Sequence, residues 1–252
     1  MAKAAIISDI HSNLEALLAT LEDIERQGVR EVLCLGDIVG YGPDPVACTD
    51  IVRSRCQVTI CGNHDEALIK GPWGFNQFAR DAIEWTQTQM RPRFYRLGST
   101  ARWRFVATLP STHTWGDYLL AHGSPRDPTT EYILPQHATW PQPGMFEEIF
   151  QAFSSVCFVG HTHVPGVFRE GPTFTPQCDI TEPFSYEGKK LLVNVGSVGQ
   201  PRDQNWRACY VTAEEGKFMF HRVEYPLEIT QRKIRGIDGL DDRLGDRLGN
   251  GE

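Results

Sequence analysis

Apolar and polar positions follow two different periods at the start of the chain. An apolar run at residues 4–7 predicts a strand, and apolar residues then recur at helical spacing, at Leu14, Leu17, Leu18, Leu21 and Ile24. Ser12 and Glu15 have the spacing of a capping box at the start of this helix, and Gly28 is placed to end it. The pattern predicts a strand, a loop and a helix, in that order.

The same order repeats further along the chain. An apolar run at 32–35 precedes a loop rich in glycine and proline at 36–45, a helix to about residue 54 and another apolar run at 58–60. Strands that alternate with helices are typical of parallel βαβ units. We therefore expect these strands to form a parallel sheet.

The pattern changes between residues 71 and 110. Two helices are expected there, at about 75–90 and 98–108, and no strand. This insert contains many aromatic residues and arginines, namely Trp73, Phe75, Phe78, Trp85, Phe94, Tyr95, Trp103, Phe105, Arg80, Arg91, Arg93, Arg96, Arg102 and Arg104. It could form a cap in which arginines attract phosphate and an aromatic ring stacks on a base. The alternative is a packed helical hairpin with a solvated basic face.

Further strands are predicted in the second half of the chain, at 118–121, 156–159, 191–193, 208–212 and 217–224. The later ones lie too close together in sequence for helical crossovers, so antiparallel strands should be added here. Two sheets packed face to face between helices would result.

The chain is predicted to form one domain over residues 1–228, followed by a tail at 229–252. A length of 252 residues is enough to bury the core of a single α/β domain. The segment 236–252 is rich in glycine, aspartate and arginine, so we expect a frayed helix or disorder there.

Composition narrows the classes of protein that fit. The formal net charge of −7 works against sequence-independent binding of long nucleic acid. The chain has neither a run of 18 apolar residues nor a signal-peptide pattern, so we expect a cytoplasmic protein without a membrane partner. Its seven cysteines include no C-x-x-C pair, which favours reduced and mostly buried thiols.

Five short clusters carry side chains that bind metals. They are Asp9-Ile10-His11, Gly36-Asp37, Gly62-Asn63-His64, Ala121-His122-Gly123 and Gly160-His161-Thr162-His163. Each follows a predicted strand, so a parallel sheet would bring them to one edge. Asp9 and His11 are separated by one residue, so in an extended segment their side chains would point the same way. Imidazoles with carboxylates favour Mn, Fe, Zn, Co or Ni over Ca, and the lack of a motif cysteine argues against a structural zinc.

Taken singly, each of these histidines is better explained as a surface or hydrogen-bonded core residue. All five clusters in order, with their glycines, are hard to obtain by accident, and the joint interpretation is a site for two metal ions. His113, His137 and His221 lie outside the clusters and are expected to be structural.

This ordered set resembles the calcineurin-like metallophosphoesterase superfamily, and more closely its compact bacterial and archaeal phosphodiesterase-like members. The likeness runs from Ile6 to about Asp203 and includes the segments SDIHSN, GDIVGYGP, GNHD, AHGSP and GSVGQPRD. It implies an α/β fold, a four-layer αββα sandwich of two mixed sheets flanked by helices. The insert would then lie near the active site.

The resemblance also implies how two divalent or trivalent ions (Mn, Fe, Zn, Ni or Co) would be held. The first ion would take Asp9, His11, His163 and the shared Asp37. The second would take Asp37, Asn63, His122 and His161.

The expected reaction is hydrolysis of a phosphate ester by a hydroxide that bridges the two ions. His64 would face the substrate and protonate or hydrogen-bond the departing alkoxide. Arg202 and Gln200, just beyond the turn at 196–199, are candidates for stabilising charge on the phosphate, although either could be structural.

The leading hypothesis is a phosphodiesterase for small phosphate esters or nucleotides, such as dinucleoside polyphosphates or cyclic nucleotides. One alternative is a binding scaffold that kept the fold and lost the chemistry, and the complete ligand set with His64 counts against it. A nuclease on long DNA or RNA is a further alternative, disfavoured by the acidic charge.

Overall fold

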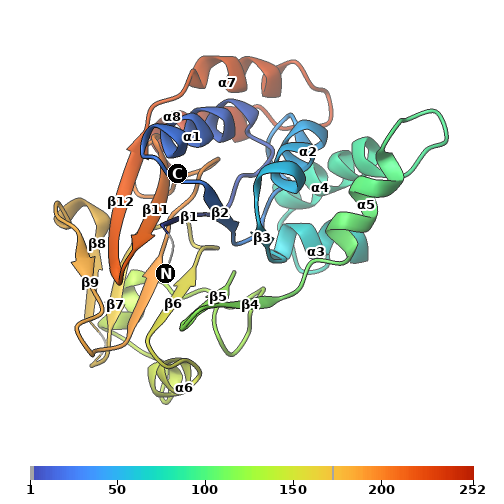
Figure 1. Ribbon diagram of the computed structural model, residues 1–252. Coiled ribbons are helices and arrows are strands. Elements are labelled where there is room, and N and C mark those ends of the chain that lie inside the picture. Colours follow the sequence, from blue (N-terminus) through green and yellow to red (C-terminus); the bar gives the residue numbers. More distant parts are fainter. Residues whose placement is uncertain (1–2, 172) are drawn as a thin grey trace.

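Two mixed sheets packed face to face form the centre of the computed structural model, which describes residues 3–171 and 173–252 (Figure 1). The first sheet has the order β3-β2-β1-β11-β12-β9, with bounds Val58–Thr59, Glu31–Cys34, Ala4–Ile7, Ala208–Glu214, Lys217–Val223 and Phe184–Ser185. The second has the order β4-β5-β6-β10-β7-β8, with bounds Thr112–Trp115, Tyr118–Ala121, Val156–Val159, Leu191–Asn194, Gly166–Arg169 and Thr173–Pro176. The predicted sandwich of two mixed sheets flanked by helices is confirmed.

Helices cover both outer faces of the two sheets. They are α1 (Leu14–Arg26), α2 (Pro45–Arg55), α3 (Asn63–Lys70), α4 (Gln77–Met90), α5 (Ser99–Ala107), α6 (Met145–Gln151), α7 (Leu227–Arg235) and α8 (Arg243–Asn250), with short 3₁₀ turns η1 (Pro135–Ala138) and η2 (Gln177–Asp179). Figure 1 shows α1 and α2 against the first sheet and α6 beyond the second. No helix within the described residues is long and apolar enough to cross a membrane.

Strand directions follow the sequence pattern. β1, β2 and β3 are parallel neighbours, as the βαβ pattern predicts. β11 and β12 pair antiparallel, and β11 joins β1 antiparallel with Ile6 opposite Val211. The second sheet contains more parallel pairing than expected, because β6 lies parallel to both β5 and β10. The short strands β4, β7, β8 and β9 were not predicted.

Alternate residues of the central strands belong to different cores. Ala5 and Ile7 of β1 pack with α1 and α2, whereas Ala4 and Ile6 pack between the two sheets. Strands that are apolar on both faces must be covered on both, which is why β1 is fully buried. The sheet edge that leads into the loops after β1 and β2 is therefore held rigidly.

The predicted capping box is wrong by one residue. Asn13, not Ser12, caps α1, because its side chain accepts a hydrogen bond from the backbone N–H of Ala16 at 3.1 Å. Ser12 has a left-handed backbone with φ of 54°, whereas an N-cap residue is extended. The Glu15 carboxylate instead accepts from Thr230, so it ties α1 to α7.

The insert forms the two predicted helices, α4 and α5, which pack on α2 and α3 at one end of the molecule (Figure 1). Trp103 and Phe105 of α5 pack partly buried against the core beneath α1 and α2. This arrangement matches the helical-hairpin interpretation for α5, while residues 73–79 reach the functional site described below.

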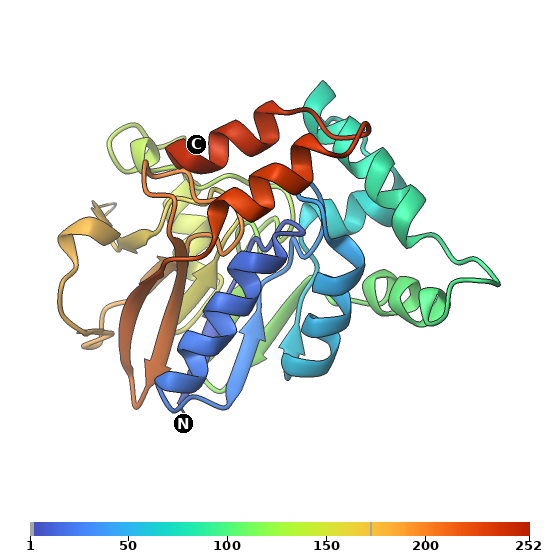
Figure 2. The same ribbon diagram turned by 90° about the horizontal axis from the view of Figure 1, so that it is seen from above.

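The prediction of a frayed helix or disorder at 236–252 is wrong, because residues 243–250 form α8. Leu240, Leu244 and Leu248 are buried in one cluster with Tyr41 and with Ala79 of the insert. Figure 2 shows the C-terminal helices, in red, lying across α1 and reaching towards the insert. The predicted boundary at residue 228 falls inside α7.

Candidate metal centre

Loops that follow four strands carry the predicted ligands to one place. Asp9 and His11 follow β1, Asp37 follows β2, His122 follows β5, and the pair His161 and His163 follows β6. Asn63 and His64 are the first residues of α3. All except Asn63 are buried.

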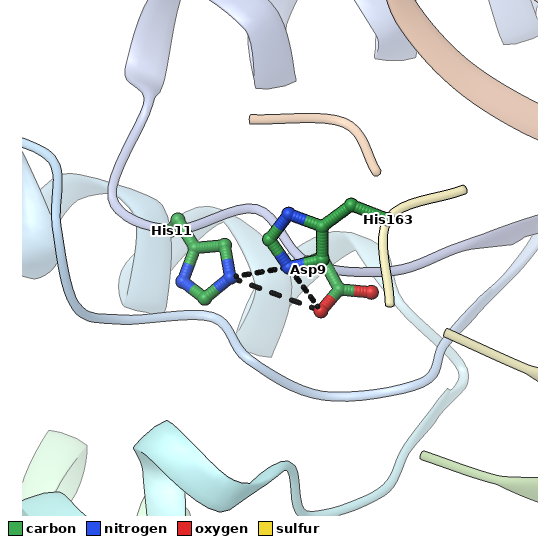
Figure 3. Close-up of side chains that lie close together, drawn as sticks. All are labelled: Asp9, His11 and His163. Atoms are coloured by element: carbon green, nitrogen blue, oxygen red, sulfur yellow. Dashed lines mark hydrogen bonds and ion pairs between the residues drawn. The ribbon is translucent and has the colours of Figure 1, made fainter. Parts of the chain in front are cut away.

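Asp9, His11 and His163 form the first group of potential ligands (Figure 3). The Nε2 atoms of His11 and His163 are 3.0 Å apart. The Oδ1 atom of Asp9 lies 3.1 Å from Nε2 of His163 and 3.8 Å from Nε2 of His11. Three ligand atoms therefore face a common point.

The second group surrounds Nε2 of His122. This atom lies 3.2 Å from Nδ1 of His161 and 3.1 Å from Oδ1 of Asn63. Oδ2 of Asp37 is 3.4 Å from it and also 3.6 Å from Nε2 of His11. One carboxylate oxygen thus lies between the two groups, where it can contact both.

Hydrogen bonds determine which ring nitrogen of His11 and His163 faces the first group. Nδ1 of His11 lies 3.1 Å from the carbonyl oxygen of Val39, and Nδ1 of His163 lies 2.5 Å from that of Gln200. A carbonyl oxygen can only accept, so each Nδ1 carries the proton and each Nε2 has a lone pair. Two lone pairs only 3.0 Å apart repel each other unless a cation lies between them.

His122 and His161 follow the same rule. Nδ1 of His122 donates to the carbonyl of Leu35 at 3.0 Å, and Nε2 of His161 donates to that of Thr130 at 3.2 Å. Their other nitrogens, Nε2 of His122 and Nδ1 of His161, face each other 3.2 Å apart. Metal-binding histidines commonly donate their second N–H to such an acceptor, which fixes the ring and its tautomer.

The two carboxylates are oriented by backbone N–H groups. Oδ2 of Asp9 accepts from the N–H of His161 at 3.0 Å, and Oδ1 of Asp37 accepts from the N–H of His64 at 2.8 Å. Oδ1 of Asp9 is buried and has no hydrogen-bond partner among the described residues. A buried carboxylate oxygen without a partner is costly, so the site fits a cation.

Neighbouring histidines favour the ionised form of both carboxylates. Burial on its own would raise the pKa of Asp9, but His163 and His122 outweigh it and hold the pKa below its usual value. Burial likewise opposes ionisation of Asp37, and His122 and His64 are the main causes that lower its pKa. The centre therefore contains negative charge that a metal ion can neutralise.

Most of the imidazoles are neutral, as metal binding requires. Burial lowers the pKa of His11 and of His163, and it lowers that of His161 to about 3. His122 differs: burial again lowers its pKa, but Asp37 and Asp9 outweigh burial and raise it to about 9. A metal ion would compete with that proton for Nε2 of His122.

The backbone at the ligands is strained. Asp9, His11, Asp37, His161 and His163 all have φ between 47° and 63°. Left-handed conformations cost non-glycine residues about 1–2 kcal/mol each, and such strain gathers at functional sites. The prediction that Asp9 and His11 lie in an extended segment is therefore wrong, although their side chains do converge.

Glycines let the chain approach the carboxylates closely. A Cβ atom on Gly62 would lie 2.1 Å from Oδ1 of Asp37, and one on Gly160 would lie 2.4 Å from Oδ2 of Asp9. No side chain fits at either position. This is the physical reason for glycine in the G-N-H-D and G-H-x-H segments.

His64 lies beside the first group and is 3% exposed. Its ring is 4.8 Å from that of His11, 4.5 Å from that of Tyr41 and 4.9 Å from that of Phe75. Burial lowers its pKa to about 4, although Asp37 opposes the shift. Nδ1 of His64 is buried without a hydrogen-bond partner within the described part of the chain.

A cavity of about 280 Å³ opens over His64 and Asn63. Its walls are mainly aromatic and come from the insert and from loops, namely Tyr41, Trp73, Gly74, Phe75, Asn76, Ala79, Thr130, Tyr132 and His161. Tyr132 packs on His161 with ring centroids 3.8 Å apart. The aromatic part of the predicted cap is thus at the site, but none of the six insert arginines lines the cavity.

Gln200 and Arg202 lie at the edge of the first group. The backbone carbonyl of Gln200 orients His163, and its side-chain oxygen accepts from Arg202 at 2.8 Å. Neither side chain lines the cavity beside His64. The histidines expected to be structural lie elsewhere; His221, for example, stacks on Tyr210 and bonds to Thr212.

Sequence reasoning missed Tyr41, Tyr132 and Arg247 at or near this site. Tyr41 lies in the G-D-I-V-G-Y-G-P segment, so this motif could have identified it. No motif marks Tyr132. Arg247 belonged to the expected tail, where the leucines at 240, 244 and 248 did have helical spacing.

Known proteins share both the sequence pattern and the fold. The sequence model of the calcineurin-like phosphoesterase superfamily domain matches residues 2–216. An uncharacterized protein of Methanocaldococcus jannaschii is 34% identical over 254 residues, covering 97% of this chain and 96% of that protein.

Solved structures agree with this match. The crystal structure of a metallophosphoesterase from Sphaerobacter thermophilus has a TM-score of 0.84 at 37% identity, covering 100% of this chain and 99% of the other. That of a hypothetical protein from Pyrococcus horikoshii OT3 has a TM-score of 0.75 at 20% identity, with coverages of 100% and 99%, and shows the shared fold. This chain therefore belongs to the calcineurin-like phosphoesterase superfamily.

Proposed function

We propose that this protein is a phosphodiesterase that uses two metal ions to hydrolyse small phosphate esters or nucleotides. One observation carries the proposal: two groups of buried histidine nitrogens flank Oδ2 of Asp37, which lies within 3.6 Å of Nε2 of both His11 and His122. A carboxylate between two sets of imidazoles is suited to bridge two cations.

We assign the candidate ligands to the two proposed ions as the family resemblance implies. The first would be held by Asp9, His11, His163 and Asp37, and the second by Asp37, Asn63, His122 and His161. This mixture of imidazole and oxygen donors suits Mn, Fe, Zn, Co or Ni. When bound, such ions act as Lewis acids and lower the pKa of a coordinated water.

We assign to His64 the role of stabilising the leaving group by a hydrogen bond. It lines the cavity, it is neutral at pH 7 because burial lowers its pKa to about 4, and its Nδ1 has no hydrogen bond among the described residues. A neutral imidazole can donate a hydrogen bond to a departing alkoxide from its protonated nitrogen. Arg202 is placed to contribute positive charge at the edge of the site.

The cavity favours a small substrate. A volume of about 280 Å³ accommodates a phosphate ester with one planar group. Tyr41, Phe75 and Tyr132 supply aromatic faces on which a nucleobase could stack. These walls and the net charge of −7 fit a nucleotide better than a long nucleic acid.

The test is a matrix of metals and substrates on the purified chain. Mn²⁺, Fe²⁺, Ni²⁺ and Zn²⁺ are each combined with p-nitrophenyl phosphate, bis-p-nitrophenyl phosphate and diadenosine tetraphosphate. We expect the diesters to be hydrolysed, and we expect His161→Gln, but not His113→Gln, to abolish turnover. Absence of hydrolysis with every combination would favour the binding scaffold instead.

A further inference from the structure

Two arginines from distant parts of the chain meet at Tyr41. The guanidinium carbons of Arg202 and Arg247 each lie 5.9 Å from the centre of the Tyr41 ring. Arg202 follows the turn after β10, whereas Arg247 belongs to α8 near the C-terminus. Tyr41 in turn lies 4.8 Å from His11 and 4.5 Å from His64, measured between ring centres. The arginines are therefore close to the metal centre.

Neither guanidinium forms an ion pair with an acidic side chain of the described residues, although the charge of Glu252 acts on Arg247. Within the described residues, no carboxylate lies within 4.0 Å of Arg202 or Arg247, although other arginines such as Arg222 and Arg243 have such partners. Nε of Arg202 is buried and makes no hydrogen bond there. The hydrogen bond of Arg247 is to the carbonyl oxygen of Glu252.

The two positive charges also influence each other. Burial and the nearby Arg202 both lower the pKa of Arg247. Holding two like charges together in a partly buried place costs free energy, and the charge of Glu252 offsets this only in part, since the pKa of Arg247 remains lowered. Arginine is the residue best suited to bind phosphate, because its planar group donates two parallel hydrogen bonds.

Packing holds Arg247 in place. The neighbouring Leu248 is 4% exposed within the cluster formed by α7, α8, the insert and Tyr41. The end of α8 is attached to the loop after Arg202, since the carbonyl of Gly251 accepts from the N–H of Gln204 at 3.0 Å. A guanidinium on a helix fixed at both places is oriented before any ligand binds.

A second cavity adjoins the one over His64. It has a volume of about 330 Å³ and is lined by arginines and acidic residues of the C-terminal segment together with Phe78 of α4. The charged residues are Arg243, Arg247, Asp246 and Glu252, and Asp246 is paired with Arg235. Tyr41 and Asn76 line both cavities, so the two are neighbours across these side chains. A substrate at the metal centre would have to reach past these side chains to contact Arg247.

We propose that Arg247 and Arg202 form a subsite for a second phosphate group of the substrate, one that is not attacked. The inference rests on the proposed function for the reaction at the metal centre. It assigns the substrate to esters that carry more than one phosphate, as nucleoside di- and polyphosphates do. The C-terminal helix then has a role in substrate recognition as well as in packing.

The experiment compares binding of ADP and AMP to the full-length chain loaded with Mn²⁺. The two nucleotides share a base and a sugar and differ by one phosphate. Isothermal titration calorimetry measures both affinities, and inhibition of bis-p-nitrophenyl phosphate hydrolysis measures them independently. Arg232→Gln is the matched control, since it removes the same charge from an exposed position on α7. Thermal melting of each variant checks folding.

We expect wild type to bind ADP roughly tenfold more tightly than AMP, because the second phosphate gains charge-assisted hydrogen bonds. Arg247→Gln should reduce this ratio towards one, and Arg232→Gln should leave it unchanged. Arg247→Lys, which keeps the charge and the aliphatic stem, should give an intermediate ratio and serves if Arg247→Gln does not fold.

Two results would overturn the subsite. One is a wild-type protein that binds ADP no more tightly than AMP, and the other is an Arg247 variant that keeps the wild-type ratio. Failure of the proposed function is distinguishable from both. A chain that hydrolyses no ester can still show the ADP preference by calorimetry, and an active phosphodiesterase can lack it.

Discussion

Substituting Asp37 by asparagine should remove most of the stability that metal binding adds. Oδ2 of Asp37 lies 3.6 Å from Nε2 of His11 and 3.4 Å from Nε2 of His122, so one change affects both proposed ion sites. An amide offers a neutral oxygen in place of a charged one. Both sites should bind metal more weakly, and binuclear occupancy should be lost.

The magnitude follows from binding linkage. At a free metal concentration of 100 times Kd, each site stabilises the native state by about 2.7 kcal/mol, so two sites contribute about 5.4 kcal/mol. For a chain of 252 residues, each kcal/mol raises Tm by roughly 2–4 °C, and the expected rise is about 11–22 °C. If Asp37→Asn weakens each site about a hundredfold, the gain falls to about 0.4 kcal/mol per site and the rise to about 2–3 °C.

The assay is differential scanning fluorimetry of chelator-treated protein, with and without added Mn²⁺, combined with elemental analysis. Comparing the loaded and stripped forms of each variant cancels the effect of the substitution on the metal-free fold. Asp117→Asn, at an exposed turn, is the matched control and should retain the wild-type rise. Two metal ions per chain in Asp37→Asn, with an undiminished rise in Tm, would refute the bridging role.

Three further results are expected. His64→Ala should keep its metal content and lose about 10²–10⁴-fold in kcat on alkyl esters, with a smaller loss on p-nitrophenyl esters, and an equal loss on both would remove the role at the leaving group. Gly199→Ala should lower the free energy of unfolding by about 2 kcal/mol or more in urea denaturation, because its Cβ would lie 1.8 Å from the carbonyl oxygen of Ile10, and a wild-type midpoint would contradict this. Burial lowers the pKa of His221, so the unfolded chain binds more protons there and stability should fall as pH drops below about 6.5. Unfolding free energies at about pH 7.5 and pH 5.5 should show a smaller drop for His221→Gln than for wild type, whereas an unchanged drop would assign the dependence to other groups.

The parallel βαβ units and the position of the candidate ligands after strands could be predicted from sequence because both depend on local pattern. Parallel strands present their carboxyl ends at one sheet edge, which brings together the residues after β1 and β2 in the first sheet and those after β5 and β6 in the second. The two pairs meet because the two sheets pack together, and not at the edge of one sheet as predicted. Glycines at 62 and 160 marked the positions where a side chain would collide with Asp37 or Asp9. The candidate site was thus indicated by five short motifs taken together.

Other features depend on contacts that no local pattern contains. The backbone carbonyl that fixes the tautomer of His11 lies 28 residues away, and the one that fixes His122 lies 87 residues away. The partly exposed strands β4 and β8 have weak periodicity, because their stability comes from pairing with the mostly buried strands β5 and β7. These strands form because they pair with neighbouring strands, and their own residues do not predict them.

The C-terminal segment shows most clearly the difference between what sequence predicted and what the tertiary structure decided. Its glycine, aspartate and arginine content predicted a frayed helix or disorder, because composition measures only how much apolar surface a segment carries. Three leucines are enough to fold it when Tyr41 and the insert supply the other side of the cluster. The sequence by itself indicated the candidate metal ligands and the two-sheet core through local spacing. Only the tertiary structure decided that Arg247 stands beside Tyr41, since burial is a property of both partners in a contact.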